Sequence, residues 1–209
     1  MAFGHGGHAP NYKRTMLFID GTNFLARLGE AAGIPIDAQR PTADVLRVAR
    51  HLIDGLVRGE SGVVVQRRYW CGSYTGNDED RDRIAGDLHD WNFEPVLLKA
   101  YQRREKGVDM ALAINLLVNA FHRNLDVGWL VAGDADYVQL VQEAKRYGCV
   151  IKVMAFEKHG LAPSLKLASD EFRDLDQFLT NAINADTTFR GWINKLKEEL
   201  EISGNSRKR

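Results

Sequence analysis

The stretch that decides the fold is MLFIDGTN, residues 16–23. Four apolar residues are followed at once by an aspartate, a glycine and two small polar residues. Three more short apolar runs stop at polar or glycine residues, and a longer one is interrupted only by a lysine: Val63–Val65, Val96–Leu98, Trp129–Ala132 and Cys149–Phe156. Short runs that are apolar almost throughout are typical of strands buried on both faces. The sequence therefore predicts a sheet of such strands.

Longer segments with helical spacing of apolar residues separate these runs. They are Ala43–Val57, Glu79–Trp91, Asp109–Phe121 and Tyr137–Tyr147. Strands that alternate with helices indicate an α/β fold, in which a central parallel sheet carries helices on both faces. Gly148 follows the last of these helices, where a left-handed cap is expected. Further along, we expect a short helix at Leu161–Ala168, an edge strand at Glu171–Leu175 and a helix at Thr187–Glu201.

The composition limits the kinds of partner. The 209 residues include 28 basic and 28 acidic side chains, so the formal net charge is zero. A general electrostatic attraction to nucleic acid is therefore absent, and a nucleic-acid partner has to be held by local basic patches. No apolar run approaches the roughly 18 residues that span a bilayer, and residues 1–11 lack a signal-peptide core. We expect a cytoplasmic protein with no membrane partner.

The two cysteines, Cys71 and Cys149, lie far apart and form no CxxC pair. This spacing speaks against a zinc site of the usual kind. Two buried thiols in a reducing compartment are the simpler interpretation.

Carboxylates follow the predicted strands at one edge of the sheet. Asp20 follows the first run, Asp134 and Asp136 follow the run at 129–132, and Asp109 begins a helix after a basic loop. Each aspartate alone is explained by helix capping or by the helix dipole. Together they are expected to converge, because ligands of an open parallel sheet bind outside the carboxyl ends of its strands.

Converging carboxylates repel one another, and a divalent cation relieves that repulsion. Hard oxygen ligands without histidine or cysteine indicate Mg²⁺ or Mn²⁺. Phosphodiester hydrolysis would use such a site, since the metal activates a bound water and neutralises charge on the phosphate. Asn23 would orient a carboxylate, water or phosphate. Thr22 would act similarly or would only cap a helix.

Three ordered blocks resemble the NYN domain family, a branch of the PIN-like nuclease superfamily. They are Phe18–Asn23, Lys106–Leu112 and Val131–Leu140, and the resemblance extends over roughly residues 15–175. It implies a Rossmann-like PIN-type fold and metal-dependent cleavage of RNA. By position, it makes Asp20, Asp109 and Asp134 the principal metal carboxylates. It makes Asp136 a further ligand, or a residue that acts through water, and Asn23 their polar companion.

One position departs from the family pattern. Where family members often carry a second acid, six residues after Asp109, this chain has Asn115. An amide coordinates or hydrogen-bonds without supplying charge, so a second metal would be held less strongly. We include Asn115 and Thr22 among the expected substrate contacts.

The basic loop before Asp109 is the predicted RNA-binding segment. It has one aromatic ring, Tyr101, among the cations Lys99, Arg103, Arg104 and Lys106. Phosphate contacts and base stacking would follow from this composition.

We expect three regions: a flexible tail at 1–14, the nuclease domain at 15–180, and a C-terminal helix with a basic tail at 181–209. An apolar stripe on the last helix is expected to pack on its own domain, with homodimerisation as the alternative: Phe189, Trp192, Ile193, Leu196 and Leu200. Two other functions stay open besides the metal-dependent endoribonuclease. One is a non-catalytic regulator that binds RNA or a partner, and the other is a metal-dependent phosphatase or DNA nuclease.

Overall fold

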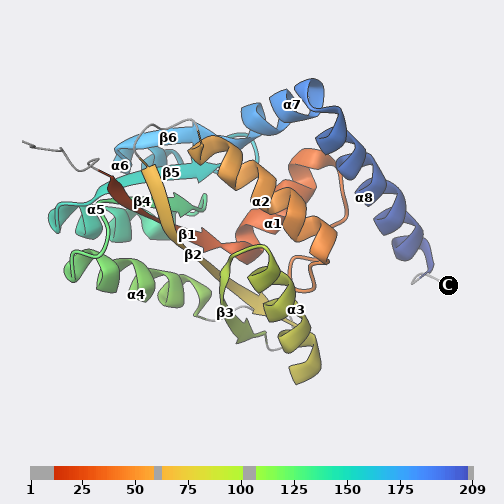
Figure 1. Cartoon of the computed structure of the whole chain (residues 1–209), viewed down its shortest axis with the longest axis horizontal. Helices are drawn as coiled ribbons and strands as arrows, with labels where there is room; N and C mark the ends of the chain where they lie inside the picture. Colours follow the sequence, from red (N-terminus) through yellow and green to blue (C-terminus); the bar gives the residue numbers. More distant parts are fainter. Residues whose placement is uncertain (1–11, 59–62, 101–106, 207–209) are drawn as a thin grey trace, which may run out of the picture.

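The structure is a computed structural model and describes residues 12–58, 63–100 and 107–206 (Figure 1). Most of the predicted tail at 1–14 and the basic residues 207–209 lie outside this part of the chain. No helix among the described residues is both long and apolar enough to cross a membrane.

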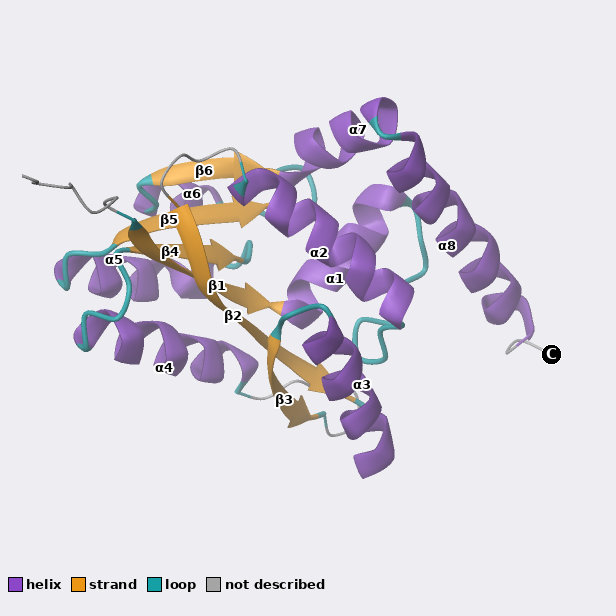
Figure 2. Ribbon diagram, in the orientation of Figure 1, coloured by secondary structure: helices purple, strands orange, loops and turns teal. Residues whose placement is uncertain are grey.

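One parallel sheet of six strands, in the order β3-β2-β1-β4-β5-β6, organises the fold (Figure 2). Because the order reverses direction between β1 and β4, the carboxyl ends of these two central strands border the switch point where α/β folds bind ligands. The strands are β1 (Lys13–Asp20), β2 (Val63–Tyr74), β3 (Glu94–Lys99), β4 (Val127–Val131), β5 (Val150–Ala155) and β6 (Glu171–Asp174).

Helices cover both faces of the sheet, which confirms the predicted α/β architecture (Figure 1). One layer contains α1 (Gly21–Ala32), α2 (Ala43–Val57), α3 (Asp78–Asp90), α7 (Leu175–Ala185) and α8 (Thr187–Ser206). The other contains α4 (Val108–Phe121), α5 (Val138–Arg146) and α6 (Pro163–Ala168). A short 3₁₀ turn, η1 (Ala135–Tyr137), precedes α5.

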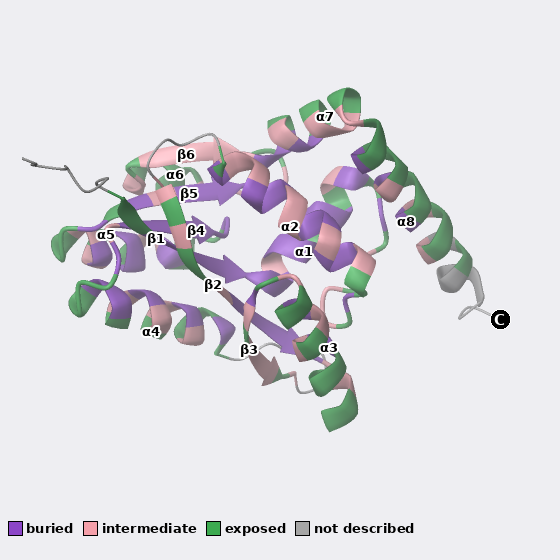
Figure 3. Cartoon of the chain, viewed as in Figure 1, coloured by how far each residue is buried: buried purple, intermediate pink, exposed green. Residues whose placement is uncertain are grey.

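The side chains of β1 point alternately to the two faces of the sheet, so the hydrophobic core has two parts. Leu17 and Ile19 pack into the layer with α1 and α2, whereas Met16 and Phe18 pack into the layer with α4 and α5. Successive side chains of a strand point to opposite faces, so both faces of a central strand are apolar. Figure 3 shows the central strands buried along most of their length.

Strand β2 is longer than the predicted Val63–Val65 because its charged residues are paired. Arg68 contacts Asp54 of α2 at 3.3 Å, and Arg67 contacts Glu94 of β3 at 2.8 Å. These partners allow the strand to continue through its polar residues as far as Tyr74, nine residues beyond the predicted run.

Two helices were not predicted from the sequence, α1 at Gly21–Ala32 and α7 at Leu175–Ala185. Helix α7 crosses the predicted boundary between residues 180 and 181. Strand β1 begins at Lys13, inside the predicted tail. The left-handed cap at Gly148 is confirmed, with φ of 87°.

The apolar stripe of α8 packs on its own domain, as predicted. Phe189, Ile193 and Leu196 are buried in the same core part as α2, and Trp192 stacks against the Arg47 guanidinium at 4.5 Å. Both cysteines are free and buried, which confirms the prediction of two buried thiols.

Candidate active site

A pocket of about 400 Å³ lies at the carboxyl ends of the central strands. Strands β1 and β4 are parallel neighbours, so Asp20 at the end of β1 and Asp134 just after β4 reach the same edge. The start of α4 brings Asp109 to this edge, and η1 brings Asp136. We call this the carboxylate pocket; its lining is Asp20, Thr22, Asn23, Ala26, Gly107, Val108, Asp109, Asp134, Asp136 and Tyr137.

Asp20 is the most deeply placed carboxylate, with 8% of its surface exposed. Its Oδ1 accepts a hydrogen bond from the Asn23 N–H at 3.1 Å, so the side chain caps α1. Its Oδ2 accepts a hydrogen bond from the Tyr137 hydroxyl at 2.7 Å. Hydrogen bonds from the α1 backbone and from the η1 side chain therefore orient both oxygens.

Tyr137 is 3% exposed and supplies the cross-link between β1 and η1. Burial, followed by the nearby Asp20 charge, raises the pKa of its phenol well above the ordinary value. The hydroxyl therefore stays protonated and keeps donating to Asp20. The sequence shows Tyr137 only as a member of the third block. Its partner lies 117 residues away, so the contact becomes visible only with the strand order.

The other three carboxylates are exposed. Asp134 Oδ1 accepts a hydrogen bond from the Asp136 N–H at 3.3 Å and so caps η1. Asp109 lies in the first turn of α4, where the helix dipole favours a negative charge. Asp109, Asp134 and Asp136 form no ion pair within the described part of the chain, so their carboxylates are available to a ligand.

Thr22 and Gly21 fix the start of α1 against β2. Thr22 Oγ1 accepts a hydrogen bond from the Ser73 N–H at 2.9 Å. A Cβ on Gly21 would lie 2.1 Å from Nε1 of Trp70, so only glycine permits this approach of helix and strand. Ser73 was not among the predicted site residues, because the predicted strand ended at Val65 and β2 continues to Tyr74.

The electrostatic character of the carboxylate pocket is acidic. Its described lining contains four aspartates and no lysine, arginine or histidine. Next to it, burial and then the Asp20 charge raise the pKa of the Cys71 thiol to about 12. Such a thiol stays protonated at neutral pH and is a poor nucleophile.

The oxygen atoms that line the carboxylate pocket are of the chemical type that hard divalent cations bind, namely carboxylate and amide oxygens. Their positions, however, are too far apart for a metal site. Among the described residues, no three acidic, histidine or cysteine side chains lie close enough together to hold a metal ion as they stand. A metal would have to draw the exposed carboxylates inward.

Two predicted contacts lie outside the described lining of the carboxylate pocket. Asn115 is six residues after Asp109, roughly 240° around the helix axis, and its amide donates to the Ala111 carbonyl at 2.8 Å. Lys99 is the exposed last residue of β3. The other predicted basic contacts, Arg103, Arg104 and Lys106, lie outside the described residues.

Comparison with known proteins identifies the family and finds solved structures that are similar to this chain. The sequence model of the NYN domain matches residues 14–176. A crystal structure of a protein of unknown function from Vibrio parahaemolyticus superposes with a TM-score of 0.60 at 18% identity, covering 81% of this chain and 97% of that one.

A short-chain dehydrogenase/reductase variant from Serratia marcescens reaches a TM-score of only 0.28 at 11% identity, covering 77% of this chain and 64% of that one. No curated protein matches the sequence. The family match spans all of the sheet except Lys13, and every described residue that lines the carboxylate pocket. The chain belongs to the NYN domain family, within the PIN-like nuclease superfamily.

Proposed function

We propose that this protein is a metal-dependent endoribonuclease that hydrolyses RNA phosphodiester bonds with Mg²⁺ or Mn²⁺. One observation carries the proposal: four aspartates from three separate segments line one pocket at the switch point of the sheet, with no basic side chain in its described lining. Four like charges in one pocket are unfavourable unless a cation joins them. Family membership supports a nuclease.

In this proposal, Asp20 and Asp134 would hold the metal from the two central strands, and Asp109 and Asp136 would contribute further carboxylate oxygens. Asp20 is held by two hydrogen bonds and provides the fixed point. The other three carboxylates are exposed and would have to move toward it to share a metal. A bound Mg²⁺ or Mn²⁺ would supply an activated water and neutralise charge on the phosphate.

The polar neighbours position the reacting groups. Asn23 lies in the first turn of α1 and lines the carboxylate pocket, where its amide can orient the attacking water or a phosphate oxygen. Thr22 is engaged with Ser73, so its contribution is to hold α1 in place. Lys99 and the basic residues 103, 104 and 106 would hold the RNA backbone beside Asp109.

The test is cleavage of labelled single-stranded RNA, hairpin RNA and single-stranded DNA in Mg²⁺, Mn²⁺ or EDTA. We expect cleavage of RNA with either metal and none with EDTA. Asp20→Asn and Asp134→Asn should each lose at least a hundred-fold in rate, and Asp87→Asn, an acid outside the pocket, should retain full activity. If RNA binds but is not cut with either metal, the nuclease proposal is wrong. The protein would then be a non-catalytic RNA-binding regulator.

A further inference from the structure

Helix α4 is apolar on its outer side as well as on the side that faces the sheet. Residues 110–121 contain no charged side chain, and their only polar residues are two asparagines. Both asparagines donate to the helix backbone, Asn115 to the Ala111 carbonyl and Asn119 to the Asn115 carbonyl, each at 2.8 Å. A helix that is apolar all round is normally buried on all sides. In the described part of the chain, however, only one side of α4 is covered (Figure 3).

Four large apolar side chains form a stripe along the outer side, which we call the α4 stripe: Met110, Ile114, Val118 and Phe121. Their exposed fractions lie between 48% and 64%. They recur every three or four residues and so share one face of the helix, opposite the buried Leu112 and Leu116. At the end of the stripe, the Phe121 ring contacts the exposed Tyr147 ring, with centroids 5.8 Å apart. A contiguous exposed apolar surface of this kind marks an interaction site.

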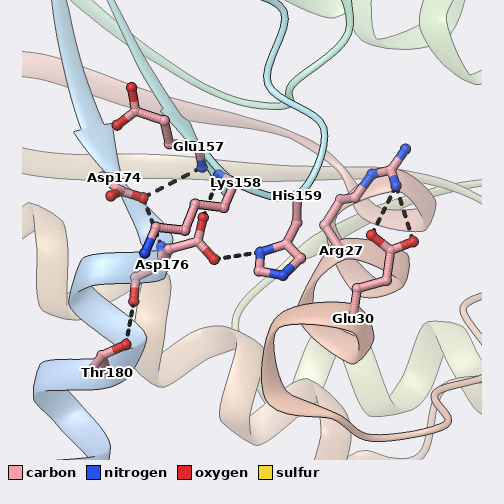
Figure 4. Close-up of polar contacts among 8 residues, drawn as sticks. All are labelled: Arg27, Glu30, Glu157, Lys158, His159, Asp174, Asp176 and Thr180. Atoms are coloured by element: carbon pink, nitrogen blue, oxygen red, sulfur yellow. Dashed lines mark hydrogen bonds and ion pairs between the residues drawn. The ribbon is translucent and has the colours of Figure 1, made fainter.

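The polar side chains around the start of α7, by contrast, are bound within the chain (Figure 4). Asp176 Oδ1 lies 2.6 Å from Nδ1 of His159, and its Oδ2 accepts a hydrogen bond from the Lys158 N–H at 2.7 Å. Asp174 Oδ1 accepts from the Asp176 N–H at 2.8 Å. That surface is satisfied within one copy of the chain, whereas no described residue covers the α4 stripe.

An open groove of about 420 Å³ runs beside the first half of the α4 stripe, between α4 and α5. Met110, Ala113 and Leu117 of α4 and Leu140 of α5 form the apolar part of its lining. The first half of α4 thus borders a hollow, and its last residue, Phe121, presents an exposed ring. A two-fold axis through the middle of α4 would place residue 121 of each copy opposite residue 110 of the other. Each ring would then meet the groove of the other copy.

The charges at the two ends of α4 favour the same antiparallel arrangement. Asp109 lies in the first turn, and the exposed Arg123 lies two residues after the helix ends. Neither side chain forms an ion pair within the residues that the structure describes. In an antiparallel pair, the Asp109 end of one helix lies beside the Arg123 end of the other, so the charges are complementary. A parallel pair would place like charges side by side.

We propose that a second copy of this chain covers the α4 stripe, in a two-fold dimer whose α4 helices are antiparallel. In such a dimer the same surface is used by both copies, and this surface carries both halves of the match, the ring and the groove. The stripe has no charge to desolvate. One helix face makes a small interface, so we expect a dissociation constant on the order of 1–10 µM. The inference concerns assembly and does not depend on the proposed nuclease function.

Sedimentation velocity of the whole chain, from about 1 to 200 µM, tests the dimer. The mass should rise with concentration from 23.5 kDa toward about 47 kDa, twice that of one chain. Ile114→Glu and Phe121→Glu should each weaken association at least about a hundred-fold, because the symmetry buries the new charge twice. Both residues are exposed in the single copy, so the fold should tolerate the change. Leu167→Glu, at an 86% exposed leucine of α6, is the matched control and should associate like the wild type.

Cross-linking tests the antiparallel arrangement with different variants. Both native cysteines are buried, so an introduced surface cysteine is the reactive one. Met110→Cys and His122→Cys place cysteines at opposite ends of α4. A short bismaleimide linker should join the two variants when they are mixed, and should join neither variant to itself. Linking within one variant alone would show a parallel pair and would overturn the arrangement.

Three other results would also overturn the inference. The first is a protein that stays monomeric at 200 µM. The second is a dimer that Ile114→Glu and Phe121→Glu leave intact. The third is a monomer whose affinity for single-stranded RNA falls in Ile114→Glu but not in Leu167→Glu, because the α4 stripe would then bind nucleic acid. Since sedimentation and cross-linking do not depend on cleavage, a protein that cuts no RNA but dimerises as described loses only the nuclease proposal.

Discussion

Removing the Tyr137 hydroxyl should destabilise the protein through Asp20. In Tyr137→Phe the ring stays in its buried place, and the one lost contact is the 2.7 Å hydrogen bond to Asp20 Oδ2. A hydrogen bond to a charged group contributes about 1.5–3 kcal/mol. Because Asp20 borders the carboxylate pocket, water can replace part of this bond, and we expect a loss near the lower end, about 1.5–2 kcal/mol.

Tyr74→Phe is the matched control for this change. Tyr74 is similarly buried, at 4% exposed, and its hydroxyl has no hydrogen-bond partner among the described residues. Its loss should change the free energy of unfolding by less than about 0.5 kcal/mol. Urea denaturation followed by tryptophan fluorescence measures both variants, and for a chain of this length Tyr137→Phe should lower Tm by roughly 3–8 °C. A Tyr137→Phe protein as stable as Tyr74→Phe would refute the assigned role of this bond.

Two further substitutions test contacts of strand β1 and helix α1 with their neighbours. Gly21→Ala places a Cβ where the Trp70 indole now lies. We expect overpacking to lower the free energy of unfolding by about 1–3 kcal/mol, measured by the same urea denaturation. An unchanged free energy of unfolding would contradict the close contact between Gly21 and Trp70. Asp126→Asn tests the pH response, since the Arg14 guanidinium beside Asp126 lowers the pKa of that carboxyl. Its stabilisation is present above the unfolded pKa of about 3.9 and is lost as pH falls through the lower folded value. The difference in Tm between wild type and variant should therefore shrink as the pH is lowered below about 4, and a difference that grows would contradict the assignment.

The central part of the fold could be predicted because its signal is local. Runs such as Met16–Ile19 are buried on both faces, so they are apolar throughout and stand out from the segments around them. The aspartates that follow them mark the carboxyl ends of strands. The strand order then gathers Asp20, Asp109, Asp134 and Asp136 in one pocket, as the sequence analysis expected from the edge they share.

The missed elements depend on contacts between distant residues. Helix α1 opens with Gly-Thr-Asn, which is typical of a turn, and its glycine is explained only by Trp70 of β2. The middle of β2 is too polar to be predicted as a strand, and only the structure shows Asp54 and Glu94 as the partners of its two arginines. The same holds for the bond from Tyr137 to Asp20 and for the pairing of His159 with Asp176, since neither residue pair is close in sequence.

Direct titration of Mn²⁺ into the protein, followed by calorimetry or by the electron paramagnetic resonance of the free ion, tests the central claim that the four aspartates form a metal site. We expect saturable binding to the wild type, strongly weakened in both Asp134→Asn and Asp20→Asn, and unchanged in Asp87→Asn. Binding that is absent at millimolar Mn²⁺, or that is equally strong in all three variants, would contradict it.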